Sequence, residues 1–81
     1  MPRYFFHLRD HTDQVLDPEG VECANTAVVE AKAMAAARDI IGNDAKTGAV
    51  DMRYRIDVED SSDRIVHTIE FEDAVSFQRA A

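Results

Sequence analysis

Apolar and polar side chains alternate over residues 2–9, near the start of the chain. Tyr4, Phe6 and Leu8 fall on one side of this stretch, and charged or aromatic residues fall on the other. Alternation with a period of two predicts a β-strand with one buried face. A shorter second strand is expected at residues 14–16, because turn-forming Asp and Thr residues separate the two runs.

The same alternation returns at residues 52–59 and 64–71, which predicts a β-hairpin. Closing the hairpin at Ser61 and Ser62 places apolar residues opposite one another: Val58 with Ile65, Ile56 with His67, Tyr54 with Ile69, and Met52 with Phe71. The opposite side then pairs Glu59 with Arg64 and Arg53 with Glu70. Because a one-residue slip would turn every apolar side chain to solvent, this register is the expected one.

An alanine-rich stretch between these strands has the spacing of a helix. Asn25 or Thr26 is a suitable N-cap, and Gly42 with Asn43 is a suitable stop, so the helix should end at about Ile41. At 100° per residue one face collects the small and branched residues Val29, Ala33, Ala36, Ala37 and Ile40. Its small side chains would let the helix lie close to a sheet.

The order of elements, β-β-α-β-β, predicts the α+β class. We expect a two-layer sandwich, with a four-stranded antiparallel sheet in the order 2-1-3-4 and one helix on one face. Residues 1–78 should form a single small domain, with a frayed tail at residues 79–81. The other face of the sheet would remain open.

Composition limits the cellular locations and the classes of protein that fit this sequence. The chain has 81 residues, one Cys and a net charge of −7, so it is acidic and lacks any intramolecular disulfide. Its apolar runs fall far short of the roughly 20 residues of a membrane span, and no secretory segment precedes the first strand. A cytoplasmic protein without membrane partners is expected. Because a core this small gives little stability, we expect a second copy of the chain to stabilise it, which predicts a homodimer.

Few residues suggest a catalytic, cofactor-binding or metal-binding site. The glycines are too scattered for a nucleotide loop, and Cys23 is best interpreted as a small buried side chain, so we expect no catalytic residue and no cofactor. A group of His and Asp residues near the first turn offers weak metal candidates: His7, His11 and Asp17. The alternative is a solvated turn, which Asp residues commonly form. His67 is either a satisfied histidine at the edge of the core or a pH-sensitive group.

The outer sheet face is the candidate interaction surface. It would carry Arg3, Phe5, His7, Arg9, Arg53, Arg55 and Arg64. The five arginines outnumber the three carboxylates expected there, Asp57, Glu59 and Glu70, although the whole chain is acidic. Such a face suits packing against a second copy or, alternatively, stacking on bases and holding phosphates.

The opening Pro-Arg-Tyr-Phe-Phe-His, from Pro2 to His7, resembles the start of an uncharacterised family of short alphaproteobacterial proteins, a domain of unknown function. The similarity continues through Asp17 and Gly20, the alanine-rich helix, residues 53–58 and a Phe-x-Asp-Ala-Val segment at residues 71–75. The chain departs from the usual pattern at Asp10-His11 and at Cys23. The family has no assigned activity, so the resemblance implies no functional residue.

The functional expectation is a non-enzymatic interaction or regulatory domain acting as a homodimer. The alternative is a nucleic-acid-associated or antitoxin-like module that uses the Arg/Phe face. The order of elements is similar to that of the partial ferredoxin-like modules of antitoxins. An enzyme or metal-binding protein built on His7, His11 and Asp17 is the third alternative. The net charge of −7 argues against general affinity for phosphate backbones.

Overall fold

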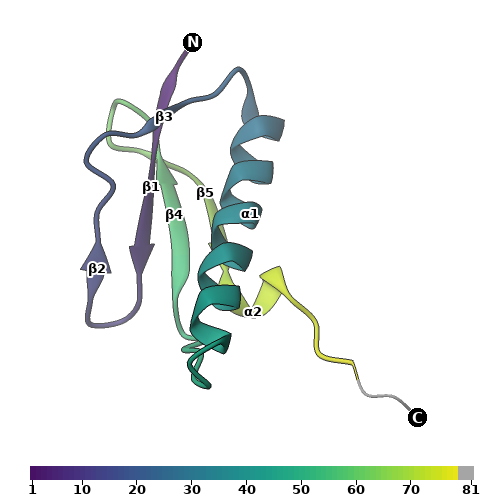
Figure 1. The fold of residues 1–81 in the computed structure, drawn as a ribbon. Coiled ribbons are helices and arrows are strands. Elements are labelled where there is room, and N and C mark those ends of the chain that lie inside the picture. Colours follow the sequence, from purple (N-terminus) through teal and green to yellow (C-terminus); the bar gives the residue numbers. More distant parts are fainter. Residues whose placement is uncertain (79–81) are drawn as a thin grey trace.

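The structure, a computed structural model, describes residues 1–78 as one sheet with a long helix across one of its faces (Figure 1). The elements in chain order are β1 (Arg3–Arg9), β2 (Gln14–Val15), β3 (Val21–Glu22), α1 (Thr26–Ala45), β4 (Arg55–Glu59), β5 (Ile65–Glu70) and α2 (Phe71–Ala74). The α+β class with an antiparallel sheet and one main helix is confirmed. The tail expected at residues 79–81 lies outside the described residues.

The sheet has five strands rather than the expected four, and the strand order differs from the expected one by the additional strand β3. Strands run β2-β1-β4-β5, and β3 pairs with β1 as well. Leu8 of β1 lies opposite Val15 of β2, whereas Tyr4 lies opposite Val21 of β3. The two short strands therefore share one edge of β1, separated by the loop at residues 16–20.

Asp17 holds that loop against β1. Its carboxylate accepts hydrogen bonds from the main-chain N–H groups of Phe6, at 3.2 Å, and Gly20, at 3.1 Å. A side chain thus replaces the strand partner that β1 lacks between β2 and β3. Gly20 has a φ of +71°, in the left-handed region that favours glycine. A Cβ atom there would lie 2.8 Å from the Tyr4 carbonyl oxygen and 2.9 Å from a ring carbon of Phe5.

Replacing Gly20 by Ala should therefore destabilise the domain by about 2 kcal/mol, because left-handed strain and a main-chain clash act together. Gly42→Ala is the matched control. Gly42 lies inside α1, and a Cβ atom added there would meet nothing within 4 Å, so this change should stabilise by up to about 1 kcal/mol. Urea denaturation of both variants measures the difference. Equal effects of the same sign would contradict the conformation assigned to Gly20.

The β4–β5 hairpin has a different register from the expected one. Ile56 lies opposite Ile69, and Val58 lies opposite His67, which is a shift of two residues, with an irregularity at Glu59. The shift arises in the loop, where the Asp60 carboxylate accepts N–H groups from Ser62 and Arg64 and so builds a wider turn. Because the shift is even, the faces are preserved, but the expected pairs of Glu59 with Arg64 and Arg53 with Glu70 are wrong.

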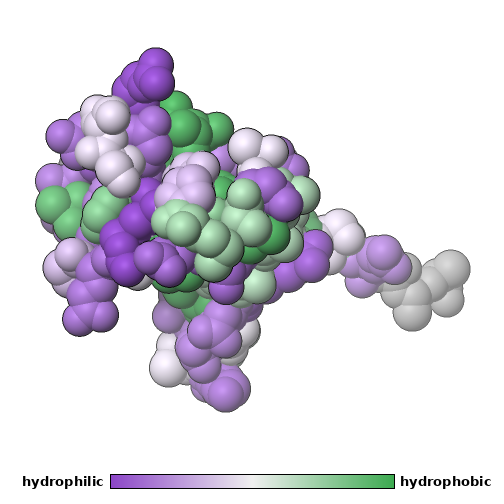
Figure 2. Space-filling model, turned by 90° about the horizontal axis from the view of Figure 1, so that it is seen from above, coloured by the Kyte–Doolittle hydropathy of each residue, from purple (hydrophilic) through white to green (hydrophobic). Residues whose placement is uncertain are grey.

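The helix α1 begins where expected and ends later than expected. The Asn25 side chain accepts the Val28 N–H at 3.0 Å, which caps the first turn. Gly42 and Asn43 are helical, and α1 continues to Ala45, so the expected stop is wrong. Its buried residues are Val29, Ala33, Ala37 and Ile41, one stripe with a spacing of four. Seen from above, moderately apolar residues gather over the helix beside a more hydrophilic surface (Figure 2).

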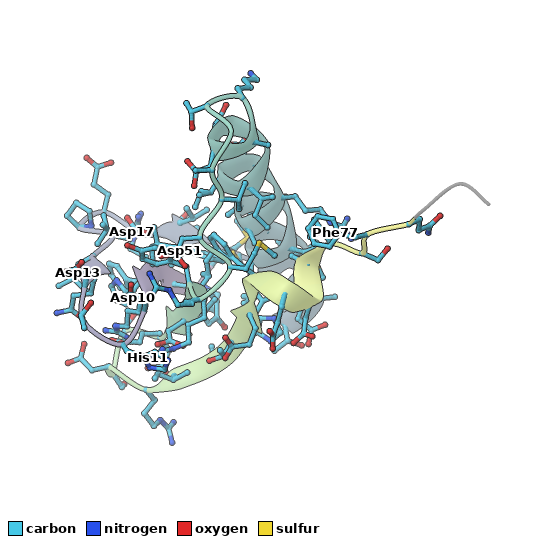
Figure 3. All side chains as sticks on the ribbon, turned by 90° about the horizontal axis from the view of Figure 1, so that it is seen from below. Asp10, His11, Asp13, Asp17, Asp51 and Phe77 are labelled. Atoms are coloured by element: carbon cyan, nitrogen blue, oxygen red, sulfur yellow. The ribbon has the colours of Figure 1, made fainter. Side chains whose placement is uncertain are left out.

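The core lies between α1 and the inner face of β4 and β5. Val58 and Phe71 are among its most deeply buried side chains, and Cys23 is buried with them. Phe71, expected as the last residue of a strand, instead begins α2. The Arg38 Nε donates to the Ala74 carbonyl at 2.8 Å and so ties α2 to α1. After α2 the chain leads away from the sheet and α1, and Phe77 is 85% exposed (Figure 3).

Candidate functional site

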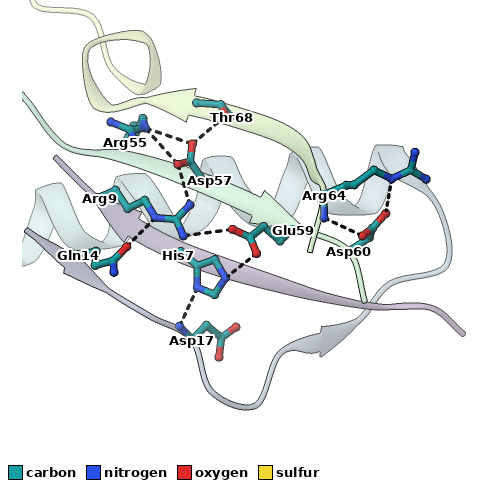
Figure 4. Close-up of polar contacts among 10 residues, drawn as sticks. All are labelled: His7, Arg9, Gln14, Asp17, Arg55, Asp57, Glu59, Asp60, Arg64 and Thr68. Atoms are coloured by element: carbon teal, nitrogen blue, oxygen red, sulfur yellow. Dashed lines mark hydrogen bonds and ion pairs between the residues drawn. The ribbon is translucent and has the colours of Figure 1, made fainter. Parts of the chain in front are cut away.

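Asp57 lies at the centre of a polar cluster on the outer face of the sheet (Figure 4). Its carboxylate accepts hydrogen bonds from Arg9 at 3.0 Å, from Arg55 at 3.2 Å and from the Thr68 hydroxyl at 2.8 Å. Three adjacent strands contribute these groups, since β4 lies between β1 and β5. Asp57 is only 2% exposed although the helix covers the opposite face. The side chains around it shield it from water.

Arg9 links this cluster to the edge of the sheet. Its guanidinium donates to Asp57, to Glu59 at 3.1 Å and to the Gln14 side chain at 3.1 Å. The hydrogen bond to Asp57 raises the pKa of Arg9, against the opposing effect of burial. Burial alone would raise the pKa of Asp57, but the hydrogen bonds from Arg9 and Thr68 and the charge of Arg55 lower it. The cluster is therefore a set of ion pairs that neutralise one another.

His7 is fixed within the same face and is only 8% exposed. Its Nδ1 accepts the Asp17 N–H at 3.0 Å, so the neutral ring carries its proton on Nε2. That nitrogen lies 3.6 Å from a Glu59 carboxylate oxygen, and the ring stacks on Phe5 with centroids 6.4 Å apart. These contacts give His7 a structural role in holding the loop at Asp17.

The expected basic face does not form as one surface. Arg3, Arg53 and Arg64 lie apart from the cluster and each faces a carboxylate of its own: Glu22 at 3.7 Å, Asp51 at 2.9 Å and Asp60 at 3.8 Å. Together with Arg9 and Arg55, all five arginines of the predicted face thus have an acidic neighbour. The sequence predicted an excess of positive charge because the count of carboxylates omitted Glu22, Asp51 and Asp60.

The weak metal candidates are only partly brought together. His7 and Asp17 are adjacent, but their contact uses the main-chain N–H of Asp17 rather than its carboxylate. His11 lies in the turn after β1, near Asp10 and Asp13 (Figure 3). There the Asp10 carboxylate accepts the N–H groups of Thr12 and Asp13, as a turn former does. Within residues 1–78 no three potential ligands are grouped to hold a metal ion.

Asp57 is the residue whose role the sequence did not reveal. The alternation of its strand places it on the outer face as one charge among several, without any indication that it is buried. The available signal is its position, a carboxylate in the middle of an alternating strand with Arg55 two residues earlier on the same side. Burial itself depends on Arg9 and Thr68, which come from strands distant in the sequence.

The surface of residues 1–78 includes two hollows of similar size. One, of about 280 Å³, lies between α1 and the β1 edge and is lined by Phe6, Asp17, Val21, Lys32 and Ala36. The other, of about 290 Å³, is polar and lies beside the turn after β1, between Arg9 and Arg55. The polar hollow is also lined by residues 10–14 of the turn, among them His11.

Acid should destabilise the domain through its aspartates. Burial would raise the pKa of Asp17, but the N–H groups of Gly20, Phe6 and Glu19 lower it below its usual 3.8. The pKa of Asp57 is lowered too, and hydrogen bonds from Arg53 lower the pKa of Asp51 to about 2. A lowered pKa contributes stability that is present above the unfolded value and is lost as pH falls through the folded value.

We therefore expect the free energy of unfolding to fall between about pH 4 and pH 2. Asp17→Asn should make this decline shallower as well as reduce stability at neutral pH, because its charged form accepts three main-chain N–H groups. Urea denaturation at several pH values measures the slope. An unchanged slope in the variant would contradict the role assigned to the Asp17 carboxylate.

Comparison with known protein families identifies a match over most of the chain. The family described as a domain of unknown function, DUF6894, matches residues 3–72, which include every strand and all of α1. No curated protein and no solved structure matches the chain. None of the helices within residues 1–78 combines the length and the apolar character needed to cross a membrane. The matched segment spans most of the sequence, and the chain belongs to the DUF6894 family of domains of unknown function.

Proposed function

We propose that this chain is a non-enzymatic interaction domain that works as a homodimer. The observation that carries the proposal is the exposure of large apolar side chains at both edges of the sheet. Val15 and Leu16, at one edge, are 64% and 51% exposed, and Ile65 and Val66, at the other, are 56% and 44% exposed. A core of this size leaves little stability in reserve, so covering such side chains with a second copy is favourable.

The outer face is less suited to the role that the sequence suggested for it. Phe5 is half-buried against His7, and the five arginines lie beside carboxylates. Binding to phosphates would have to compete with those ion pairs, in a chain whose net charge is −7. A self-neutralised cluster of this kind supports a structural role for the face and favours the edges as the proposed contact.

Light scattering over a wide range of protein concentration tests this function. We expect the molar mass to rise from that of one chain to that of two. Binding of single-stranded RNA at low salt, measured by fluorescence anisotropy, is the parallel experiment, and we expect none. A wild type that stays monomeric at every concentration would contradict the proposal, and RNA binding that weakens with added salt would favour the nucleic-acid alternative.

A further inference from the structure

We propose that the free edge of β5 is the contact surface and that β5 of a second copy pairs with it antiparallel, joining the two sheets. This inference rests on the proposed homodimer and identifies its interface. An unpaired strand edge offers a row of main-chain donors and acceptors to any extended chain. Within residues 1–78, β5 has β4 on one side and no strand on the other.

The main-chain groups that face outward can be identified. In antiparallel pairs, residues alternate between those hydrogen-bonded to the neighbour and those pointing away. The Phe71 N–H donates to the Tyr54 carbonyl at 3.0 Å, which is in the same register as the β4–β5 pairs. Counting back from Phe71 as far as the irregularity beyond His67, we infer that Glu70 and Thr68 turn their N–H and C=O groups away from β4.

The opposite edge of the sheet is a poorer template. There β2 and β3 have two residues each and are separated by the loop at Asp17. Short, interrupted edge strands are a common protection against pairing with other chains. By contrast, β5 runs for six residues without proline or glycine and exposes Ile65 and Val66 beside its free edge. Among the described strands, exposed apolar side chains and a long free main-chain edge coincide at β5.

A second copy fits this edge because β5 is complementary to itself. A two-fold axis at Thr68 places its outward N–H and C=O groups opposite those of Thr68 in the second copy, and it places the N–H of each Glu70 opposite the start of the partner's β5. Arg64, 81% exposed in its side chain, directly precedes β5, and Glu70 ends it, so antiparallel pairing brings the arginine end of one copy to the glutamate end of the other. Two-fold symmetry repeats this opposite-charge contact at both ends of the paired strands.

Glu70→Pro is the variant that tests main-chain pairing. Glu70 has a φ of −78°, which proline adopts, and its N–H is among those that point away from β4. The matched control is Glu70→Ala, which keeps the N–H and removes the carboxylate. We expect Glu70→Pro to raise the dimer dissociation constant at least about tenfold, because one main-chain bond is lost at each end, and Glu70→Ala to change it far less.

Val66→Lys with Val15→Lys as its control provides a second test that does not depend on proline. A lysine at β5 should weaken the dimer, whereas the same change at the opposite edge should leave it intact. Circular dichroism checks that each variant is folded. A dimer that survives both β5 variants would overturn the β5 interface and leave the homodimer standing. Equal weakening by Glu70→Pro and Glu70→Ala would also overturn main-chain pairing, and a monomeric wild type would overturn both proposals.

Discussion

Val58→Asp should cost about 4 kcal/mol or more, the largest effect we expect from any single change. Val58 is fully buried on the inner face of β4, opposite Phe6 of β1 and His67 of β5. A carboxylate there would lose its hydration without gaining a partner. Since the single core of a domain of this length rarely supplies more than about 3 to 5 kcal/mol, the variant should be largely unfolded in the absence of a stabilising osmolyte.

Val15→Asp is the control, because Val15 is 64% exposed on a two-residue edge strand. We expect a change within about 0.5 kcal/mol. Circular dichroism with chemical denaturation compares the two variants at a protein concentration where dimers do not form. If both substitutions were equally damaging, the assignment of the inner face of β4 would be wrong.

Asp57→Ala should destabilise the domain by about 3 kcal/mol, because it leaves two buried or half-buried arginines without their shared partner. Arg9 would keep Glu59, at 3.1 Å, but Arg55 and Thr68 would each lose the carboxylate that they contact. The expected loss arises from uncompensated charge rather than from packing. Thermal unfolding followed by circular dichroism measures it.

Asp51→Ala provides a comparison with similar contacts and different burial. Asp51 also accepts hydrogen bonds from an arginine, Arg53, at 2.9 Å, but Arg53 is 75% exposed in its side chain. Water screens such a pair, so the change should be much smaller than at Asp57. Equal losses at the two positions would show that burial does not set the energetic weight of the Asp57 cluster.

The sequence predicted most of the fold where a local pattern and a buried face agree. Alternation at Tyr4, Phe6 and Leu8 identified β1, and the parity of Ile56 and Val58 was correct even though their partners were not. The predicted register of β4 and β5 was wrong because register depends on the connecting loop, and Asp60 builds a turn there that is wider than two residues. The helix continued past Gly42 because a glycine in an exposed turn of helix costs only about 1 kcal/mol.

The candidate site was less predictable, because its properties depend on residues far apart in the sequence. The sequence identified most residues of the outer face. It gave the number of charges there but not which arginine forms an ion pair with which carboxylate. Arg9 and Asp57 are 48 residues apart, and Thr68 reaches the same carboxylate from a third strand. Likewise, β3 is only two residues long, and its pairing with β1 depends on Asp17, which holds the preceding loop against β1.

Amide hydrogen exchange at Thr68 is the direct measurement of pairing at the β5 edge. We infer that its N–H points away from β4, so in a monomer it should exchange freely, like an exposed amide, while the N–H of Ile69 is protected by the ladder. We expect that raising the protein concentration protects Thr68 and Glu70 together and leaves Val15 unchanged. Exchange at Thr68 that stays fast while light scattering reports a dimer would contradict the β5 interface.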